Sequence, residues 1–123
     1  MRRSILKSKL HGVYVNKSNL DYEGSCTIPR RYLELADIKP FEKVHILNVS
    51  NGTRLETYAI VGDDPSSFEI NGAAAHLIHE GEKILILTYA GVNDEDLPNF
   101  ETVLIFLDEK NTKYRVVKKR PVL

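Results

Sequence analysis

The sequence contains one cysteine, no excess of charge of either sign and no long hydrophobic run. Cys26 has no second cysteine to pair with, so an intrachain disulfide is excluded and a reducing compartment is expected. The 17 basic and 17 acidic side chains balance, which argues against a nucleic-acid-binding protein because such proteins usually carry a basic excess. Charged residues interrupt the segment behind the basic N-terminus, so the sequence predicts neither a signal peptide nor a membrane span. We therefore expect a soluble protein of the cytoplasm.

The length and the pattern of apolar residues together predict one small, mainly β domain. A chain of 123 residues holds one modest core, and we expect a single domain over residues 1–123. The run at 83–89 is almost wholly apolar, which is typical of a strand buried on both faces. Two short helices are also expected. The predicted strands cover residues 4–16, 44–50, 53–61, 68–70, 83–89, 102–107 and 112–117. This count favours a small β-barrel over a helical or βαβ domain.

The first predicted strand carries a lysine and a histidine on one face. In strict alternation Lys9 and His11 project together, on the same face as Val13 and Val15. From the alternation alone, this pair is more typical of a solvated strip on a half-exposed strand. Its interpretation as part of a site depends on the other motifs.

A hairpin is the clearest local signal. Asn51-Gly52 lies between two β-rich runs and predicts a type I′ turn, because both central residues of that turn need positive φ. On the return strand Arg54 and Tyr58 share one face, while Thr57 points to the other. One hairpin thus carries a cation, a phenol and a hydroxyl within five residues.

A short helix is expected after the polar, turn-rich segment 17–21 and the stretch 22–25 that follows it. Thr27 is the predicted N-cap, with Pro29 tolerated in the first turn. Apolar residues then recur at helical spacing, and Pro40 prevents the helix from continuing far. The apolar stripe consists of Ile28, Tyr32, Leu35 and Ala36.

The Gly24–Ser25 peptide bond is the candidate position for chemistry. Gly24 lacks a Cβ and can adopt strained backbone angles that expose its carbonyl to the Ser25 hydroxyl. Attack by that hydroxyl would give an oxyanion and then an ester, provided that Thr57 or a backbone N–H stabilises the negative oxygen. β-Elimination would free the Gly24 carboxylate and leave dehydroalanine, which hydrolyses to a pyruvoyl group. A serine after a glycine is also common in ordinary loops, so its position alone does not establish this route.

The segment Asn71-Gly72-Ala73-Ala74-Ala75 has very little side-chain bulk. Such a segment lets a ligand or another backbone approach its main-chain N–H groups closely. The alternative is an ordinary turn that runs into a short helix.

Five stretches stand in a recognisable order and at recognisable spacings: Lys9-Leu10-His11, Tyr22-Glu23-Gly24-Ser25, 48–54, Thr57-Tyr58 and 71–75. Together they resemble the pyruvoyl-dependent aspartate 1-decarboxylases, which make β-alanine for pantothenate and hence for coenzyme A. The resemblance covers residues 3 to 90, with a weaker tail. It implies a six-stranded double-psi β-barrel with short helices, assembled as a homotetramer with active sites between subunits. It also implies self-cleavage between Gly24 and Ser25 into a β chain, 1–24, and an α chain, 25–123.

The resemblance further implies a covalent cofactor, a pyruvoyl group made from Ser25. Its ketone would form a Schiff base with the amine of L-aspartate and accept the electrons that remain at Cα when carbon dioxide leaves. Pyridoxal phosphate accepts such electrons in other enzymes, but it is not expected in a small chain without a phosphate-binding loop. Tyr58 matches the family's proton donor. Arg54 and Lys9 suit the two carboxylates of the substrate.

The remaining positions of the implied site follow by the same match. Substrate-binding positions are Thr57 and the backbone of Gly72, Ala73 and Ala74, and supporting positions are His11, Tyr22 and Asn71. Alternation places Thr57 and Tyr58 on opposite faces, so both can serve one site only if the strand bends or if the site lies between subunits.

Three alternatives stay open at this stage. A metal site at His45, His76 and His79 lacks a carboxylate or thiolate at a known ligand spacing, and no metal is expected. Cys26 beside Ser25 suggests a thiol nucleophile, although a small hydrophobic filler explains it more simply. A non-enzymatic barrel that binds DNA or protein is the alternative function, since fold alone does not settle function. The sequence is compatible with spontaneous maturation and with maturation helped by a second protein, a maturation factor.

Overall fold

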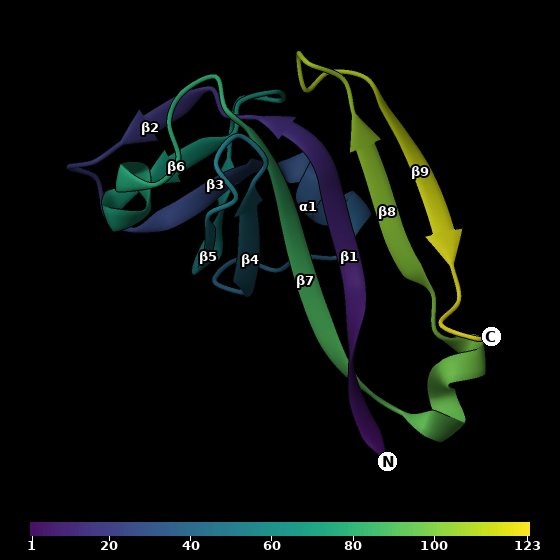
Figure 1. Cartoon of the computed structure of the whole chain (residues 1–123). Coiled ribbons are helices and arrows are strands. Elements are labelled where there is room, and N and C mark those ends of the chain that lie inside the picture. The colour runs from purple at the N-terminus through teal and green to yellow at the C-terminus, as the bar shows by residue number, and fades with distance from the viewer.

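The computed structural model describes residues 1–123 and consists of nine strands in one mixed sheet, with three short helices (Figure 1). Hydrogen bonds connect the strands in the order β2-β6-β3-β5-β4-β7-β1-β8-β9. The strands are β1 (Arg2–Tyr14), β2 (Lys17–Asn19), β3 (Ser25–Pro29), β4 (Lys43–Asn48), β5 (Arg54–Gly62), β6 (Glu69–Asn71), β7 (Lys83–Asn93), β8 (Thr102–Leu107) and β9 (Tyr114–Lys119). The helices are α1 (Arg30–Ala36) and the 3₁₀ helices η1 (Gly72–His76) and η2 (Asp94–Asn99).

One hydrophobic core lies inside the curved sheet. It unites 18 buried residues, most of which come from α1, from β1 and from β3 to β8. The connecting segments contribute Val15, Ile38, Phe68 and Ile78. The ends of β1 and β7 reach beyond this body toward η2 and the N-terminus (Figure 1). The prediction of mainly β structure with short helices is confirmed, and the arrangement is consistent with a β-barrel. None of the helices has the length and apolar character needed to cross a membrane.

Two strands were not predicted, and one of them replaces an expected helix cap. β2 is a polar three-residue strand, parallel to β6. β3 pairs in parallel with β5 and antiparallel with β6, so Thr27 lies opposite Ile60 and Glu69. The prediction of Thr27 as an N-cap is therefore wrong, since α1 begins only at Arg30. Pairing on both sides of β3 outweighs the local capping signal, as tertiary context often does.

A bulge changes the face of β1 partway along the strand. The register against β7 shifts between His11 and Val13, and Gly12 there has φ of 82°. Lys9 and His11 share a half-buried face, but Val13 joins Leu10 in the core. The predicted face holds only up to His11, because a bulge inserts one residue and reverses the alternation.

The hairpin at Asn51-Gly52 is confirmed, but its turn type is not. Of the two central residues Asn51 and Gly52, only Gly52 has positive φ. The prediction of a two-residue type I′ turn is therefore wrong. The loop instead covers residues 49–53 and is closed by two 2.8 Å bonds, from the Gly52 N–H to the Asn48 carbonyl and from the Asn48 N–H to the Thr53 carbonyl. The Asn48 side chain also accepts the Ser50 N–H at 3.0 Å, which stabilises this longer loop.

The apolar run in β7 is buried on one face only. Ile84 and Ile86 are fully buried, while Leu85 and Leu87 are half-exposed. The expectation of a strand buried on both faces is therefore wrong for the single chain. The outer face of β7 is apolar and lies beside the equally half-buried Lys9 and His11 of β1.

Candidate functional site

The Gly24–Ser25 bond lies where an exposed loop enters a buried strand. Ser25 begins β3 and is 1% exposed, while the preceding residues up to Gly24 are exposed. Across the sheet Ser25 pairs with Asn71, the last residue of β6. The hydroxyl is thus fixed and shielded, while the peptide bond before it stays at the surface.

Asn71 holds the Ser25 hydroxyl from inside the sheet. Its Nδ2 donates to Ser25 Oγ at 2.9 Å and to Thr27 Oγ1 at 3.0 Å. Both hydrogens of the amide are therefore used, and Ser25 Oγ acts as an acceptor. On the other side, Asn71 Oδ1 accepts a bond from Asn19 Nδ2 at 3.0 Å. All four side chains lie within one short network next to the candidate bond.

Gly72 brings the chain of η1 against Gly24. It has φ of 73°, and a Cβ at this position would lie 2.7 Å from Gly24 Cα and 2.9 Å from Gly24 N. Another backbone thus approaches this segment closely, as predicted. The alternative of a turn that runs into a short helix also describes the segment, because Gly72 begins η1. The approach needs a glycine for two reasons, the positive φ and the missing Cβ.

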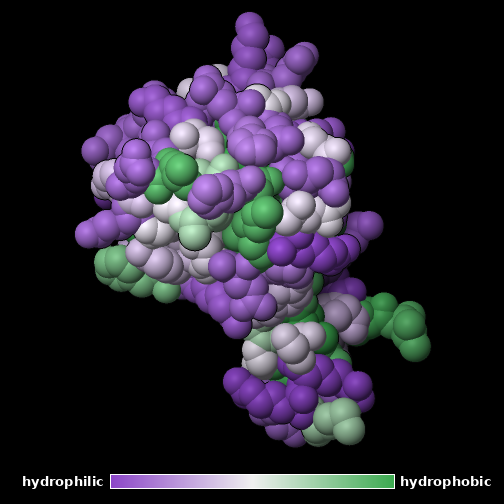
Figure 2. Space-filling view, turned by 60° about the vertical axis from the view of Figure 1, so that its left-hand side comes forward, coloured by the Kyte–Doolittle hydropathy of each residue, from purple (hydrophilic) through white to green (hydrophobic).

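A groove of about 270 Å³ opens beside the candidate bond. It brings together Gly24, Thr57, Asn71 and the alanines that follow Gly72. The lining residues are Gly24, Leu55, Glu56, Thr57, Asn71, Ala73, Ala74 and Leu77. The molecular surface on the side of β2 and β6 is otherwise largely hydrophilic, with hydrophobic residues in small groups (Figure 2).

The predicted cationic residues lie elsewhere, on the outer face of the sheet. Across the strands, Arg54 is opposite Leu47, Leu47 opposite Leu85, and Leu85 opposite His11. Three strand spacings separate Arg54 from His11, which is ~14 Å along the sheet. Lys9 lies two residues before His11 on the same face. None of Arg54, Lys9 and His11 lines the groove.

The two faces of β5 keep Thr57 and Tyr58 apart. Arg54, Glu56 and Tyr58 are exposed, whereas Leu55 and Thr57 are half-buried. The strand thus keeps the predicted alternation, and no bend brings Tyr58 to the groove. Tyr58 packs its ring against Phe41 at a centroid distance of 6.1 Å. One chain therefore unites Gly24, Ser25, Thr57, Asn71 and the 72–74 segment, but not Lys9, His11, Arg54 and Tyr58.

Comparison with known proteins decides the family. The model of the family described as aspartate decarboxylase matches residues 1–114. This chain belongs to the aspartate decarboxylase family. A protein named aspartate 1-decarboxylase from Thermoanaerobacter pseudethanolicus is 48% identical over 112 residues, covering 90% of this chain and 96% of that protein. Proteins of the same name from Hydrogenovibrio crunogenus and Persephonella marina are 43% and 45% identical, covering 87% and 80% of their lengths.

The family resemblance inferred from the motifs is thereby confirmed. The matched residues contain every predicted site position of this aspartate decarboxylase family member and end at the first residue of β9. β9 adds one antiparallel strand to the edge of β8.

His11 and Tyr22 occupy different surroundings in this family member. Burial is the main cause that lowers the pKa of His11, and the charges of Lys9 and Lys83 lower it further. Its ring lies 5.2 Å from that of Phe106. Tyr22 is 60% exposed and borders a second hollow, of about 310 Å³, which Asn71 and Thr27 also line. His11 and Tyr22 therefore do not lie together in the structure.

Cys26 and the histidines offer no second centre. Burial raises the pKa of the Cys26 thiol to about 12, which confirms its interpretation as a small hydrophobic filler, because the thiolate is the nucleophilic form. His45 Nδ1 lies 3.0 Å from the Tyr89 hydroxyl, and His79 Nδ1 lies 3.3 Å from Glu82. No group of three or more His, Cys, Asp or Glu side chains could hold a metal ion.

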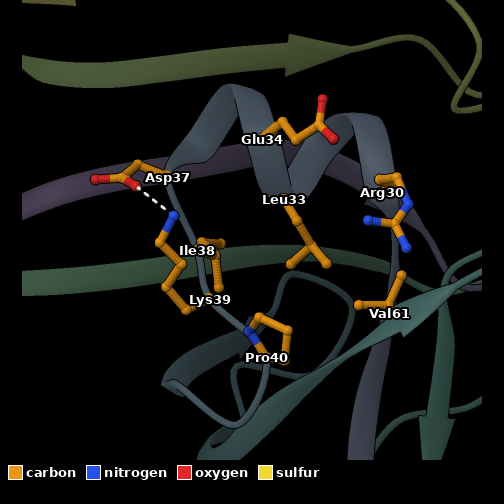
Figure 3. Close-up of a pocket in the computed structure, with 8 residues that line it drawn as sticks. All are labelled: Arg30, Leu33, Glu34, Asp37, Ile38, Lys39, Pro40 and Val61. Carbon is orange, nitrogen blue, oxygen red and sulfur yellow. Dashed lines mark ion pairs between the residues drawn. The ribbon is translucent and has the colours of Figure 1, made fainter.

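A separate hollow of about 310 Å³ lies at α1 and the loop that follows it (Figure 3). Arg30 and Glu34 border it from the helix, and an ion pair of 3.8 Å joins Lys39 to Asp37 at its rim. It contains no predicted site residue.

Asn19 and Glu69 are the site residues that sequence reasoning missed. Asn19 Nδ2 contacts both Asn71 Oδ1 and Glu69 Oε1. Asn19 sits in a polar segment that looked like a turn, and its partner lies 52 positions away. Only the parallel pairing of β2 with β6 places Asn19 opposite Asn71, and no local pattern in residues 17–19 indicates that pairing.

We expect Gly72→Ala to lower the free energy of unfolding by at least about 2–3 kcal/mol, because it combines an unfavourable positive φ with a clash against Gly24. Gly52→Ala is the matched control, since Gly52 has φ of 76° but nothing within 4 Å of its Cβ position. The control should lose only about 1 kcal/mol. Urea unfolding of both variants measures the difference. Equal losses would show that the approach of Gly24 does not matter for stability.

Proposed function

We propose that this chain is an aspartate 1-decarboxylase that converts L-aspartate to β-alanine and carbon dioxide with a pyruvoyl group made from Ser25. The product would serve the synthesis of pantothenate and coenzyme A. One observation carries the proposal: in a chain of this family, a buried serine hydroxyl follows an exposed glycine and is held by Asn71.

Self-cleavage at Gly24–Ser25 would begin with the Ser25 hydroxyl. Its Oγ forms a bond to the Gly24 carbonyl carbon, the C–N bond breaks, and the hydroxyl proton passes to the freed nitrogen. Thr57 lines the groove at Gly24 and would donate to the oxyanion. β-Elimination of the resulting ester then separates chain 1–24 from chain 25–123 and leaves dehydroalanine at position 25. Hydrolysis of the dehydroalanine by water releases ammonia and leaves the pyruvoyl group.

The residues around Ser25 fit a small carbonyl group at this position. Asn71 Nδ2 already donates there, Thr27 adds a hydroxyl, and the groove provides space for a small amino acid. The pyruvoyl group would supply an electron-poor carbonyl that accepts the electrons left by decarboxylation. Asn71 and the backbone of residues 72–74 would hold the group and the substrate beside it.

The second half of the site would come from another copy of the chain. Lys9 and Arg54 suit the two carboxylates of aspartate, and Tyr58 would protonate Cα, but all three lie outside the groove. The outer face between them is partly apolar, with Leu85 and Leu87 half-exposed. We propose a homotetramer in which this face of one subunit covers the groove of the next. The single buried cysteine supports a reducing compartment, the cytoplasm.

Mass spectrometry and a product assay test the proposal. A purified and incubated sample is expected to contain two chains that separate after Gly24, with a carbonyl group that blocks Edman degradation of the second. The same sample should form β-alanine from L-aspartate. An intact chain in an active sample would contradict the pyruvoyl mechanism. An intact chain that forms no β-alanine would instead favour the alternative of a non-enzymatic binding barrel.

Maturation is tested by the same assay. Purified chain alone that separates into two chains needs no helper. Chain that stays intact until cell extract is added would point to a maturation factor.

A further inference from the structure

Asn19, a residue outside the predicted site, contacts the side chain of Asn71 that donates to Ser25. Asn19 ends β2 and stands opposite Asn71 across the parallel pair β2–β6. β2 and β6 are the last two strands at one end of the sheet, and β6 pairs on its other side with β3, which carries Ser25 (Figure 1). Asn19 Nδ2 donates to Asn71 Oδ1 at 3.0 Å and to Glu69 Oε1 at 3.2 Å.

The carboxylate of Glu69 sets the direction of this network. An ionised carboxylate only accepts hydrogen bonds, so the Asn19 amide must turn its nitrogen toward Glu69 and Asn71. Asn71 must then turn its oxygen toward Asn19. Its nitrogen is left to face Ser25 and Thr27, as observed. With Asn71 reversed, two amide nitrogens would face one another and both donors would lose a bond.

We propose that Asn19 is a positioning residue which, together with Glu69, fixes the side-chain amide of Asn71 with its nitrogen on Ser25 Oγ. Its functional consequence rests on the proposed self-cleavage. In the β-elimination water accepts Hα as a proton, and the electron pair of the Cα–H bond forms the Cα=Cβ double bond. The Cβ–Oγ bond breaks, and its electron pair goes to Oγ. This oxygen departs as part of the Gly24 carboxylate. A donor on Oγ stabilises that charge, whereas an amide oxygen at the same place would oppose it.

The direction of the amide is measured in the uncleaved chain. In a Ser25→Ala background, NMR is expected to show a nuclear Overhauser contact between the Asn71 Nδ2 protons and the Thr27 methyl group. Adding Asn19→Leu, which removes the donor, should reduce that contact at least about twofold, because the amide becomes free to reverse. An unchanged contact would overturn the proposal. This measurement gives its answer whether or not the wild-type chain cleaves.

The consequence for cleavage is measured by mass over time. Asn19→Leu is expected to slow separation of the chains about fivefold, as the loss of one hydrogen bond of about 1 kcal/mol implies. An ester that hydroxylamine cleaves should accumulate, because elimination is the affected step. Glu69→Gln keeps the size of the side chain but lets the Asn19 amide turn either way, and it should slow cleavage about two- to threefold. Leu20→Ala is the control and should cleave at the wild-type rate, because this side chain follows Asn19 directly but is 49% exposed.

A double variant separates positioning from general stability. If Asn19 acts through Asn71, Asn19→Leu combined with Asn71→Ala should be no slower than Asn71→Ala alone. Slowing by the product of both single effects, or wild-type cleavage of Asn19→Leu, would overturn the proposal. A wild-type chain that never cleaves would refute the proposed function instead, while the NMR contact would still decide the direction of the amide.

Discussion

The Ser25→Ala variant is expected to remain one chain of 123 residues and to form no β-alanine from L-aspartate. Without the hydroxyl no ester can form at Gly24, so neither the cleavage nor the electron-accepting carbonyl arises. Turnover should fall by at least about a thousandfold, as when a covalent catalyst is removed. The fold should persist, because alanine is smaller than serine and Asn71 keeps its bond to Thr27. Mass spectrometry and chromatography of β-alanine measure both effects.

Ser50→Ala is the matched control for that variant. Ser50 is an exposed serine of the hairpin loop, far along the chain from β3. It should cleave and turn over at the wild-type rate. Measurable β-alanine from intact Ser25→Ala would disprove the pyruvoyl mechanism, whatever the control does.

The second large effect is expected at the Tyr58 hydroxyl. Tyr58→Phe should cleave normally, because this residue lies outside the groove at Gly24. Decarboxylation should fall about 10²- to 10⁴-fold, the usual contribution of a proton donor. The phenylalanine ring can keep the packing against Phe41, so the variant removes the hydroxyl alone. Cleavage by mass and turnover by β-alanine formation are measured on the same sample.

Tyr114→Phe provides the comparison for Tyr58. Tyr114 is also a partly exposed tyrosine, on β9, where it packs edge-on against Tyr32. It should retain wild-type turnover. A fully active Tyr58→Phe would remove Tyr58 from the proton-donor role and leave the cleavage proposal untouched.

The sequence pattern predicted the strands whose own residues favour β structure. β8 was predicted at its observed bounds, Thr102–Leu107, because its residues alternate or are β-branched without interruption. β2 and β3 were missed because their pairing partners lie far along the chain and their own residues are polar or include proline. The bulge at Gly12 was missed for a similar reason. A glycine permits positive φ, but only packing against β7 determines that it adopts it.

The same distinction applies to the site. Motif order pointed to Ser25, Asn71 and Gly72, and the structure places them side by side. The direction of the Asn71 amide depends on Asn19 and Glu69, which are joined only by tertiary contacts. The roles of Lys9, Arg54 and Tyr58 stay predictions, because they concern how one chain meets another.

The place of β1 has a consequence for the lifetime of the protein. This 13-residue strand lies between β7 and β8 in the interior of the sheet, yet the proposed cut separates it covalently from both. Unfolding of the mature form would release two separate chains, 1–24 and 25–123. Their reassociation would depend on concentration, whereas the folding of the newly made single chain would not. Heat denaturation of the mature enzyme should therefore be poorly reversible at low concentration, and its persistence would be set by the rate of unfolding. Such an enzyme folds efficiently only once, before it becomes active.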